Sequence, residues 1–208
     1  MRNYTLLWII CVLLMSAYPL AGGSWQWATS FGGQGMESAW DMDVNTLSGD
    51  IYVCGDFTDS LVVAGSVYPA SGESDSYIIK YNSLGMFQWI WTCGSSEQDV
   101  CLSIATDAAG NCCFSGFYSG SMTIEGNQYQ SNGGWEGYMG KLSSDGELLW
   151  FRSFGGPPTD LGYGISVDLE GNRYVTGWCG GTLDFGNNLS IPSSGRSDIC
   201  LLKTDPTG

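Results

Sequence analysis

A repeat with a period of about 61 residues constrains the fold of this 208-residue chain more than any other feature. Tryptophans recur at Trp27, Trp89 and Trp150, at intervals of 62 and 61 residues. Three further sets of residues keep this period, namely Gly55, Gly116 and Gly177; Lys80, Lys141 and Lys203; and Gly85, Gly146 and Gly208. Four landmarks with one spacing predict three copies of one structural unit, approximately residues 24–85, 86–146 and 147–208.

The third copy shows four candidate strands. They are a Trp strand that starts at Trp150, an Ile-x-Val-Asp strand at 165–168, a Tyr-Val-Thr-Gly strand at 174–177 and an Asp-x-x-x-x-Lys strand at 198–203. Such runs are short, rich in β-branched and aromatic residues, and bounded by Gly, Asn, Asp and Ser, as β-strands are. A longer loop, which includes residues 183–186, is expected before the last strand.

Four strands repeated in series are typical of a β-propeller blade. The sequence therefore predicts an all-β, propeller-like array of three four-stranded blades. Three blades in a closed ring would stand about 120° apart, which is too wide for sheet faces to pack at about 10 Å. We therefore expect an open or partial propeller, with the strand around Trp27 far from the strand around Lys203. A β-trefoil, which closes with three units, is the alternative fold.

The repeated pattern resembles a known family. The succession W-x-x-x-F-G-G, I-x-V-D-x-x-G-N-x-Y-V-x-G, D-x-x-x-x-K and D-x-x-G is similar to the SBBP-type bacterial β-propeller repeat. The similarity covers residues 24–208 and is greatest in the third copy, whereas the second has Cys93 where the others have Phe31 and Phe154. The resemblance implies a secreted or cell-surface bacterial propeller. It implies no set of catalytic residues.

The first 23 residues have the order of a secretory signal peptide. Arg2 supplies the positive charge, residues 6–15 form an apolar run, and small residues follow at 21–23. An apolar run of this length is too short to cross a bilayer comfortably. We expect cleavage near residues 21–23, a secreted or cell-surface location, and no membrane span after cleavage. An uncleaved anchor is the alternative.

The composition excludes several classes of function. Asp and Glu number 21 against 7 Lys and Arg, for a formal charge of -14, so nucleic acid is not an expected partner. The chain has no histidine, which excludes a Ser-His-Asp triad, a Cys-His pair and any His-ligated metal. We expect no cofactor and no bound metal.

Repeated acids are expected to be structural. Asp43, Asp107 and Asp168 precede a Gly-Asn or Gly-Asp pair, and an Asp at the first position of a turn caps it. In the first copy this alignment needs a three-residue insertion. Calcium is the alternative, but the alternating acids and distal Glu of an EF-type loop are missing. A second set of acids, at Glu37, Asp99 and Asp160, also recurs once per copy and is expected to be architectural.

The cysteines do not follow the repeat. Cys11 lies in the signal peptide, so the mature chain keeps seven of the eight. They stand at positions of Phe, Tyr, Ser or Thr in other copies, which favours a role as small apolar fillers. An odd number leaves at least one thiol unpaired in an exported protein. Cys93 and Cys101 form the most suitable disulfide pair.

Trp135 is the candidate surface-binding residue. It lies in the polar loop Asn-Gly-Gly-Trp-Glu at 132–136, and no tryptophan stands at this position in the other copies. An exposed Trp can stack on a sugar ring or on a partner. The alternative is that Trp135 folds back on its own blade. The repeated Trp27, Trp89 and Trp150 are expected to pack between blades instead.

Two classes of function remain open. The first is a secreted or cell-surface, non-catalytic propeller that serves as a scaffold, adhesion or binding module for an extracellular protein or glycan. Open blade faces would favour its self-association. The second is a secreted carbohydrate-active hydrolase with paired Asp or Glu at the propeller mouth, which needs no histidine. Residues 143–150 are close to a sialidase Asp-box but lack one of its residues, and we expect no enzymatic activity.

Overall fold

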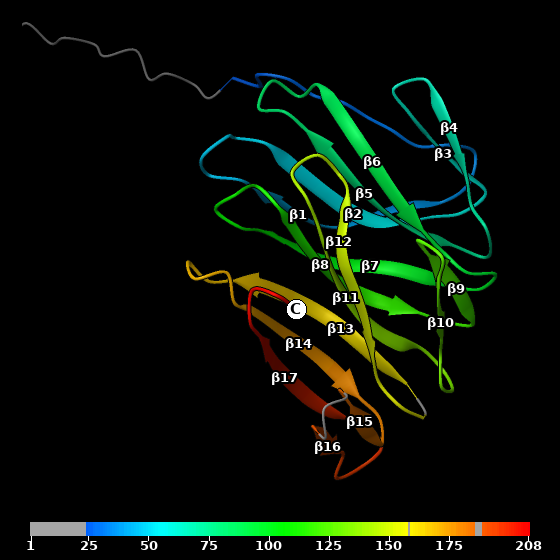
Figure 1. Ribbon diagram of the computed structural model, residues 1–208. Coiled ribbons are helices and arrows are strands. Elements are labelled where there is room, and N and C mark those ends of the chain that lie inside the picture. Colours follow the sequence, from blue (N-terminus) through cyan, green and yellow to red (C-terminus); the bar gives the residue numbers. More distant parts are fainter. Residues whose placement is uncertain (1–23, 158, 186–188) are drawn as a thin grey trace, which may run out of the picture.

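The computed structural model describes residues 24–157, 159–185 and 189–208. Every helix or strand assigned to these residues is a β-strand. The strands form three large antiparallel sheets, each accompanied by a small hairpin (Figure 1). The predicted all-β, propeller-like fold is therefore confirmed.

We call the three large sheets blades 1 to 3. Blade 1 has the order β1 (Glu37–Val44), β2 (Ile51–Phe57), β5 (Asp75–Tyr81) and β6 (Phe87–Cys93). Blade 2 consists of β7 (Asp99–Thr106), β8 (Cys112–Tyr118), β11 (Glu136–Leu142) and β12 (Leu148–Phe154). Blade 3 has β13 (Asp160–Val167), β14 (Arg173–Cys179) and β17 (Asp198–Thr204).

The blades are offset from the sequence units by one strand. The strand that carries Trp89, β6, pairs with β5 of the preceding unit, and β12, which carries Trp150, likewise pairs with β11. A blade thus ends with the Trp strand of the next copy. As a result, blade 3 has three strands among the described residues, and the segment around Trp27 belongs to no sheet.

Each blade carries a hairpin between its second and third long strands, where the sequence predicted only a loop. The hairpins are β3 (Ser60–Val63) with β4 (Ser66–Pro69), β9 (Ser121–Ile124) with β10 (Asn127–Gln130), and β15 (Thr182–Asp184) with β16 (Ser190–Pro192). Their first strands bury Leu61, Met122 and Leu183. The hairpins therefore extend the core.

A β-bulge in the first strand of each blade explains one set of repeated glycines. The register shifts at the same place in β1, β7 and β13. Gly55, Gly116 and Gly177 stand beside these shifts. A Cβ atom at Gly116 would lie 2.0 Å from the carbonyl oxygen of Val100, so only glycine permits this approach of the two strands.

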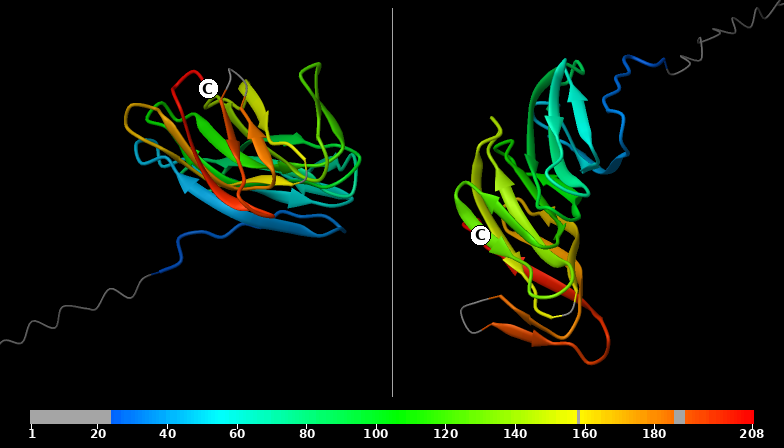
Figure 2. Two further views of the ribbon diagram at one scale, coloured as in Figure 1. Left: turned by 90° about the horizontal axis from the view of Figure 1, so that it is seen from below. Right: turned by 90° about the vertical axis from the view of Figure 1, so that its right-hand side faces the viewer.

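The core lies in the seams between blades. One cluster joins Ile78 of blade 1 to Phe114 of blade 2, and another joins Met139 of blade 2 to Val175 of blade 3. Blade 2 lies between the other two (Figure 1 and the right view of Figure 2).

The arc of three blades is open, as predicted. The strand that contains Lys203 pairs with β14 on one side, and the N-terminal segment lies at blade 1 on the far side of the array (Figure 2). The described strands form no closed barrel, which the alternative β-trefoil would need. None of the described residues forms a helix that could span a bilayer. The expected signal peptide, at residues 1–23, lies outside the described residues.

Candidate functional site

The longer connections gather along one edge of the blades. This edge carries the three hairpins and the segments that precede β7, β11, β13 and β17, and we call it the loop edge (Figure 1). The opposite edge carries the short turns from first to second strands and from third to fourth strands. Loops that converge on one edge of a rigid scaffold are where binding residues usually lie.

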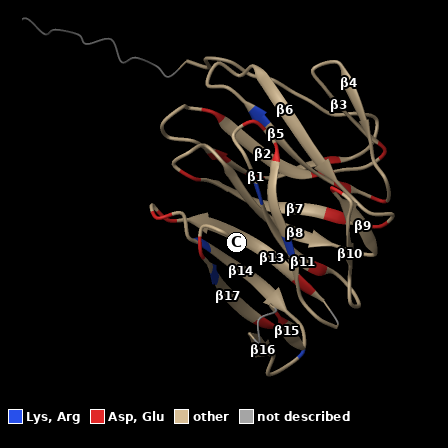
Figure 3. Cartoon of the chain, viewed as in Figure 1, with Lys and Arg blue, Asp and Glu red and all other residues tan. Residues whose placement is uncertain are grey.

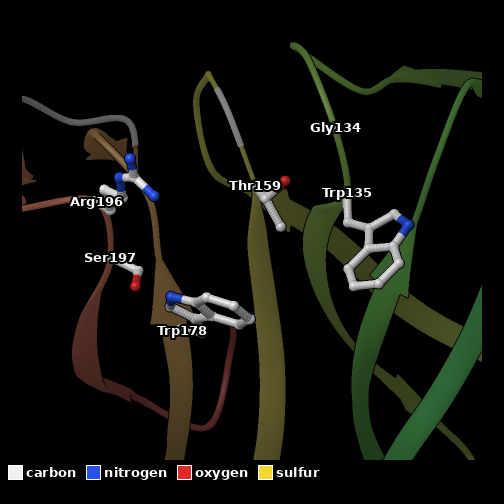
Figure 4. Close-up of a pocket in the computed structure, with 6 residues that line it drawn as sticks. All are labelled: Gly134, Trp135, Thr159, Trp178, Arg196 and Ser197. Carbon is white, nitrogen blue, oxygen red and sulfur yellow. The ribbon is translucent and has the colours of Figure 1, made fainter.

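A hollow of about 390 Å³ lies at the loop edge of blades 2 and 3 (Figure 4). Its lining comes from four segments: Gly134 and Trp135 before β11, Thr159 before β13, Trp178 on β14, and Arg196 and Ser197 before β17. The sequence separates these residues by up to 63 positions. Only the stacking of blade 3 on blade 2 brings them together.

Trp135, the predicted surface residue, lines this hollow. One face of its indole stacks on Phe117 of β8, with ring centroids 4.5 Å apart and planes inclined at 28°. The side chain nevertheless remains exposed. The ring therefore packs on its own blade, as the alternative interpretation expected, and still presents surface to the hollow. Its role in binding stays a prediction.

Trp178 is a site residue that the sequence did not single out. It lies across the hollow from Trp135 and is also exposed (Figure 4). Its position in β14 corresponds by register to Asp56 in β2 and Phe117 in β8. The sequence could have indicated Trp178 in only one way, because a tryptophan stands there where the other copies have Asp and Phe.

The lining has a definite chemical character. Aromatic rings such as those of Trp135 and Trp178 stack on flat apolar faces, including those of sugar rings. The guanidinium of Arg196 offers a fork of donors that matches a carboxylate. The six lining residues include no Asp or Glu. The hollow therefore suits a ligand that has both a stacking face and a negative charge.

Asp107 and Asp168 cap their turns, as predicted. Oδ1 of Asp107 accepts hydrogen bonds from the backbone N–H groups of Ala109 and Asn111, each at 2.9 Å. Oδ1 of Asp168 makes the same pair of bonds in blade 3. Burial of Asp107 opposes ionisation, but hydrogen bonds from Lys141 and Asn111 outweigh it and lower the pKa of this carboxyl. These acids are therefore engaged in structure.

The strand register shows that Asp43 is not equivalent to Asp107 and Asp168, contrary to the prediction. Asp43 pairs with Tyr52 inside the sheet, and Asn45 occupies the capping position, where its Oδ1 accepts from the N–H of Leu47. The carboxylate of Asp43 instead accepts the backbone N–H of Thr106 in blade 2 at 2.6 Å. The sequence alignment placed Asp43 at the capping position because it considered only Asp there. Asn caps turns as Asp does, so Asn45 was overlooked and the insertion in the first copy was made too long.

The repeated lysines anchor the capped turns. Lys80 lies 2.9 Å from Asp50, and Lys141 lies 2.8 Å from Asp107. In blade 3, Lys203 lies over the ring of Tyr174, with its Nζ 5.1 Å from the ring centroid. Each lysine therefore ties the third strand of its blade to groups of the second strand or its turn.

The repeated tryptophans pack between blades, as predicted. The indoles of Trp27, Trp89 and Trp150 lie against Gly85, Gly146 and Gly208, respectively, each of which is in or after the turn that follows the third strand of the next blade. Trp89 also donates a hydrogen bond from Nε1 to the carbonyl oxygen of Ser144 at 3.0 Å. The repeated Trp and Gly are therefore two halves of one contact.

Pairs of acids meet in the seams at the loop edge. Glu136 of blade 2 and Asp160 of blade 3 both lie about 3 Å from the Cβ position of Gly155, and both are buried. Asp75 and Asp99 form the corresponding pair between blades 1 and 2. Each of the four is the first residue of its strand, and Figure 3 shows how the acidic residues are distributed over the chain.

Backbone amides hold these carboxylates. The N–H of Ser95 donates to Asp99 at 2.6 Å, and the N–H of Gly156 donates to Asp160 at 2.8 Å. Burial raises the pKa of Asp99 to about 7, and the charge of Asp75 adds to this effect. Burial also raises the pKa of Glu136 and Asp160. These repeated acids therefore have a structural role, as was expected for Asp99 and Asp160, because each binds the backbone N–H of the residue four positions before it.

The seven cysteines of the described residues are free thiols and buried. No disulfide joins Cys93 and Cys101, the pair that the sequence made most suitable. The thiol of Cys101 instead interacts with that of Cys54, which raises the pKa of Cys54, and burial raises that of Cys93. Their role as apolar fillers agrees with this burial.

Comparison with known proteins agrees with the architecture. Residues 149–183 match the family model described as SBBP, a β-propeller repeat. This stretch runs from β12 through the first strand of the last hairpin. The resemblance is confirmed over these residues, and the propeller-like arrangement of the three blades agrees with it. A search of the curated proteins finds no match to this chain.

Proposed function

We propose that this chain is a secreted or cell-surface, non-catalytic β-propeller module that binds an acidic saccharide in the hollow at its loop edge. The observation that carries the proposal is the meeting of Trp135 and Trp178, from two blades, in one hollow with Arg196. The order of residues 1–23 supports export.

The dimensions and chemistry of the hollow support a sugar ligand. Its volume of about 390 Å³ falls within the range of roughly 300–1,000 Å³ found for small-molecule sites. Trp135 and Trp178 supply stacking surface for a pyranose ring. Arg196 supplies the donors for a carboxylate on that ring, which explains why a strongly acidic protein would accept an acidic sugar.

A glycan array that includes acidic and neutral saccharides tests this proposal. We expect the purified chain to bind carboxylate-bearing glycans, W135A to lose at least tenfold in affinity, and R196Q to lose the preference for acidic over neutral forms. L169A is the control, because Leu169 is a fully exposed apolar residue outside the hollow. Equal binding by W135A and the parent chain would contradict the proposal.

The absence of catalysis is a separate part of the proposal. It is supported by the positions of the paired acids, which are buried in the seams and hydrogen-bonded to backbone amides. A panel of aryl glycoside and ester substrates should show no turnover. Turnover that a single Asp or Glu substitution abolishes would favour the hydrolase instead.

A further inference from the structure

We infer that the free face of blade 3 is a docking surface for a second copy of this chain, and that two copies close a six-bladed ring. In this ring, residues 24–31 of each copy pair with the free edge of β17 in the other. The inference does not rest on the proposed saccharide site, although Trp178 lines both that hollow and the free face of blade 3.

The first support comes from one position in the third strand of each blade. Ile78, Met139 and Leu201 are equivalent by register, and their exposed fractions are 0%, 5% and 67%. Ile78 packs into the seam with blade 2, and Met139 packs into the seam with blade 3. Leu201 has the same orientation, but no blade covers it among the described residues.

The opposite face of the array, on blade 1, exposes an apolar position that the other blades bury. Met42, Ile104 and Ile165 share one position in the first strands, and their exposed fractions are 55%, 4% and 9%. Ile104 and Ile165 pack against the blade that precedes theirs. Met42 on blade 1 lacks such a neighbour. The chain therefore presents both halves of a blade-to-blade seam, one at each end.

The free face of blade 3 has the shape and composition of a half-seam. A hollow of about 910 Å³ lies on it, lined in part by Tyr163, Trp178 and Ile199. The side chain of Ile199 is almost fully exposed. Exposed apolar patches of this kind mark protein–protein contacts.

The N-terminal segment identifies the strand that would complete blade 3. Trp27 packs on Gly85 as Trp89 packs on Gly146, which is the contact made by the last strand of a preceding blade. Phe31 contacts Tyr77 of blade 1, with ring centroids 5.7 Å apart. Residues 24–31 thus lie where a fourth strand of a preceding blade would run, yet they belong to no sheet.

The edge of β17 is the matching acceptor. Blades 1 and 2 pair their third strands with β6 and β12, whereas β17 pairs with β14 alone among the described strands. Unpaired edges accept strands from other chains by main-chain hydrogen bonds. A second copy placed next to blade 3 would bring its own residues 24–31 to this edge.

The number of copies follows from blade arithmetic. The described residues of each copy form three blades, and propellers have about 4–8. Six is the only multiple of three in this range, so two copies close the ring. A head-to-tail contact that closes after two copies gives a twofold-symmetric dimer without free ends.

Light scattering coupled to size exclusion tests the inference on the purified chain. We expect twice the mass of the single purified chain, which is 22.4 kDa for all 208 residues and less once the signal peptide is removed. L201D places a charge on the docking face, and deletion of residues 24–31 removes the donated strand. Each change should raise the dissociation constant at least 100-fold. Circular dichroism serves to show that both variants stay folded, since Leu201 is exposed and residues 24–31 are in no sheet.

W135A, at the loop edge, is the matched control and should leave the dimer intact, which separates this inference from the saccharide site. A monomer at 0.1 mM would overturn the inference. So would a dimer that is insensitive to L201D, or an open-ended series of larger oligomers.

Discussion

Asp99 shows at the scale of one residue how burial determines what a repeated acid does. Its carboxyl is fully buried, with Oδ2 bound by the N–H and the hydroxyl of Ser95. Its Oδ1 has no hydrogen-bond partner among the described residues, and Asp75 lies nearby. Desolvation therefore favours the protonated form, and the pKa rises from 3.8 to about 7.

This raised pKa makes the stability of the chain depend on pH. Because the folded pKa exceeds the unfolded one, the contribution of Asp99 is complete below pH 4 and is lost as the pH rises through about 7. A shift of roughly three units is worth at most about 4 kcal/mol. We expect urea unfolding to give a higher free energy at pH 5.5 than at pH 8.

The D99N variant should flatten this pH dependence, because an amide does not titrate. D145N is the control, since Asp145 is exposed on a turn. Identical pH profiles for D99N and the parent chain would show that another group carries the effect.

Gly116 illustrates a second constraint at this scale. Its Cβ position lies 2.0 Å from the carbonyl oxygen of Val100 and 2.8 Å from the ring of Tyr138. We expect G116A to lower the free energy of unfolding by roughly 3 kcal/mol, because the two strands must separate. Chemical denaturation measures this loss. G195A should change it by less than about 0.5 kcal/mol, because nothing lies within 4 Å of the Cβ position of Gly195.

At the scale of elements, the lysine position of the third strands allows a comparison between blades. Lys141 forms a largely buried ion pair with Asp107, whereas Lys203 lies over a tyrosine ring. Removal of Lys141 leaves a carboxylate without its partner in a partly desolvated site. K141M should therefore destabilise the chain by about 2 kcal/mol and K203M by less than about 1 kcal/mol. Equal melting temperatures for the two variants would contradict this difference.

The sequence predicted the strands better than it predicted their pairing. The period of about 61 residues located the Trp, Ile-x-Val, Tyr-Val and Lys strands, because alternation and turn residues are local signals. The period gives the length of the repeat but not where one blade ends and the next begins. It therefore does not indicate that the Trp strand pairs with the blade before it. The hairpins were missed because strands of three or four residues, such as 60–63, are too short to show alternation.

Only one residue of the candidate site, Trp135, was predicted from the sequence. Trp135 could be selected because it lies in a polar loop. Trp178 and Arg196 join it through the stacking of blade 3 on blade 2, a long-range contact that no local pattern reports. The same limit applies to Asp43, whose hydrogen bond to Thr106 crosses a seam.

For the whole molecule, the three blades form an arc with two unlike ends. One end presents Met42 and a segment in no sheet, and the other presents Leu201 and the free edge of β17. The seams between these ends bury the same positions that the ends expose. The three blades are therefore well packed against one another, and each end of the described array exposes one half of a seam.

Hydrogen exchange of the β17 amides, followed by mass spectrometry as a function of protein concentration, tests this account most directly. We predict that residues 199–204 exchange slowly at high concentration and faster on dilution, while the equivalent amides of β11 stay protected throughout. Removal of residues 24–31 should make β17 exchange rapidly at every concentration. Equal and concentration-independent protection of β17 and β11 in the intact chain would show that the arc is closed within one molecule, and would contradict the account.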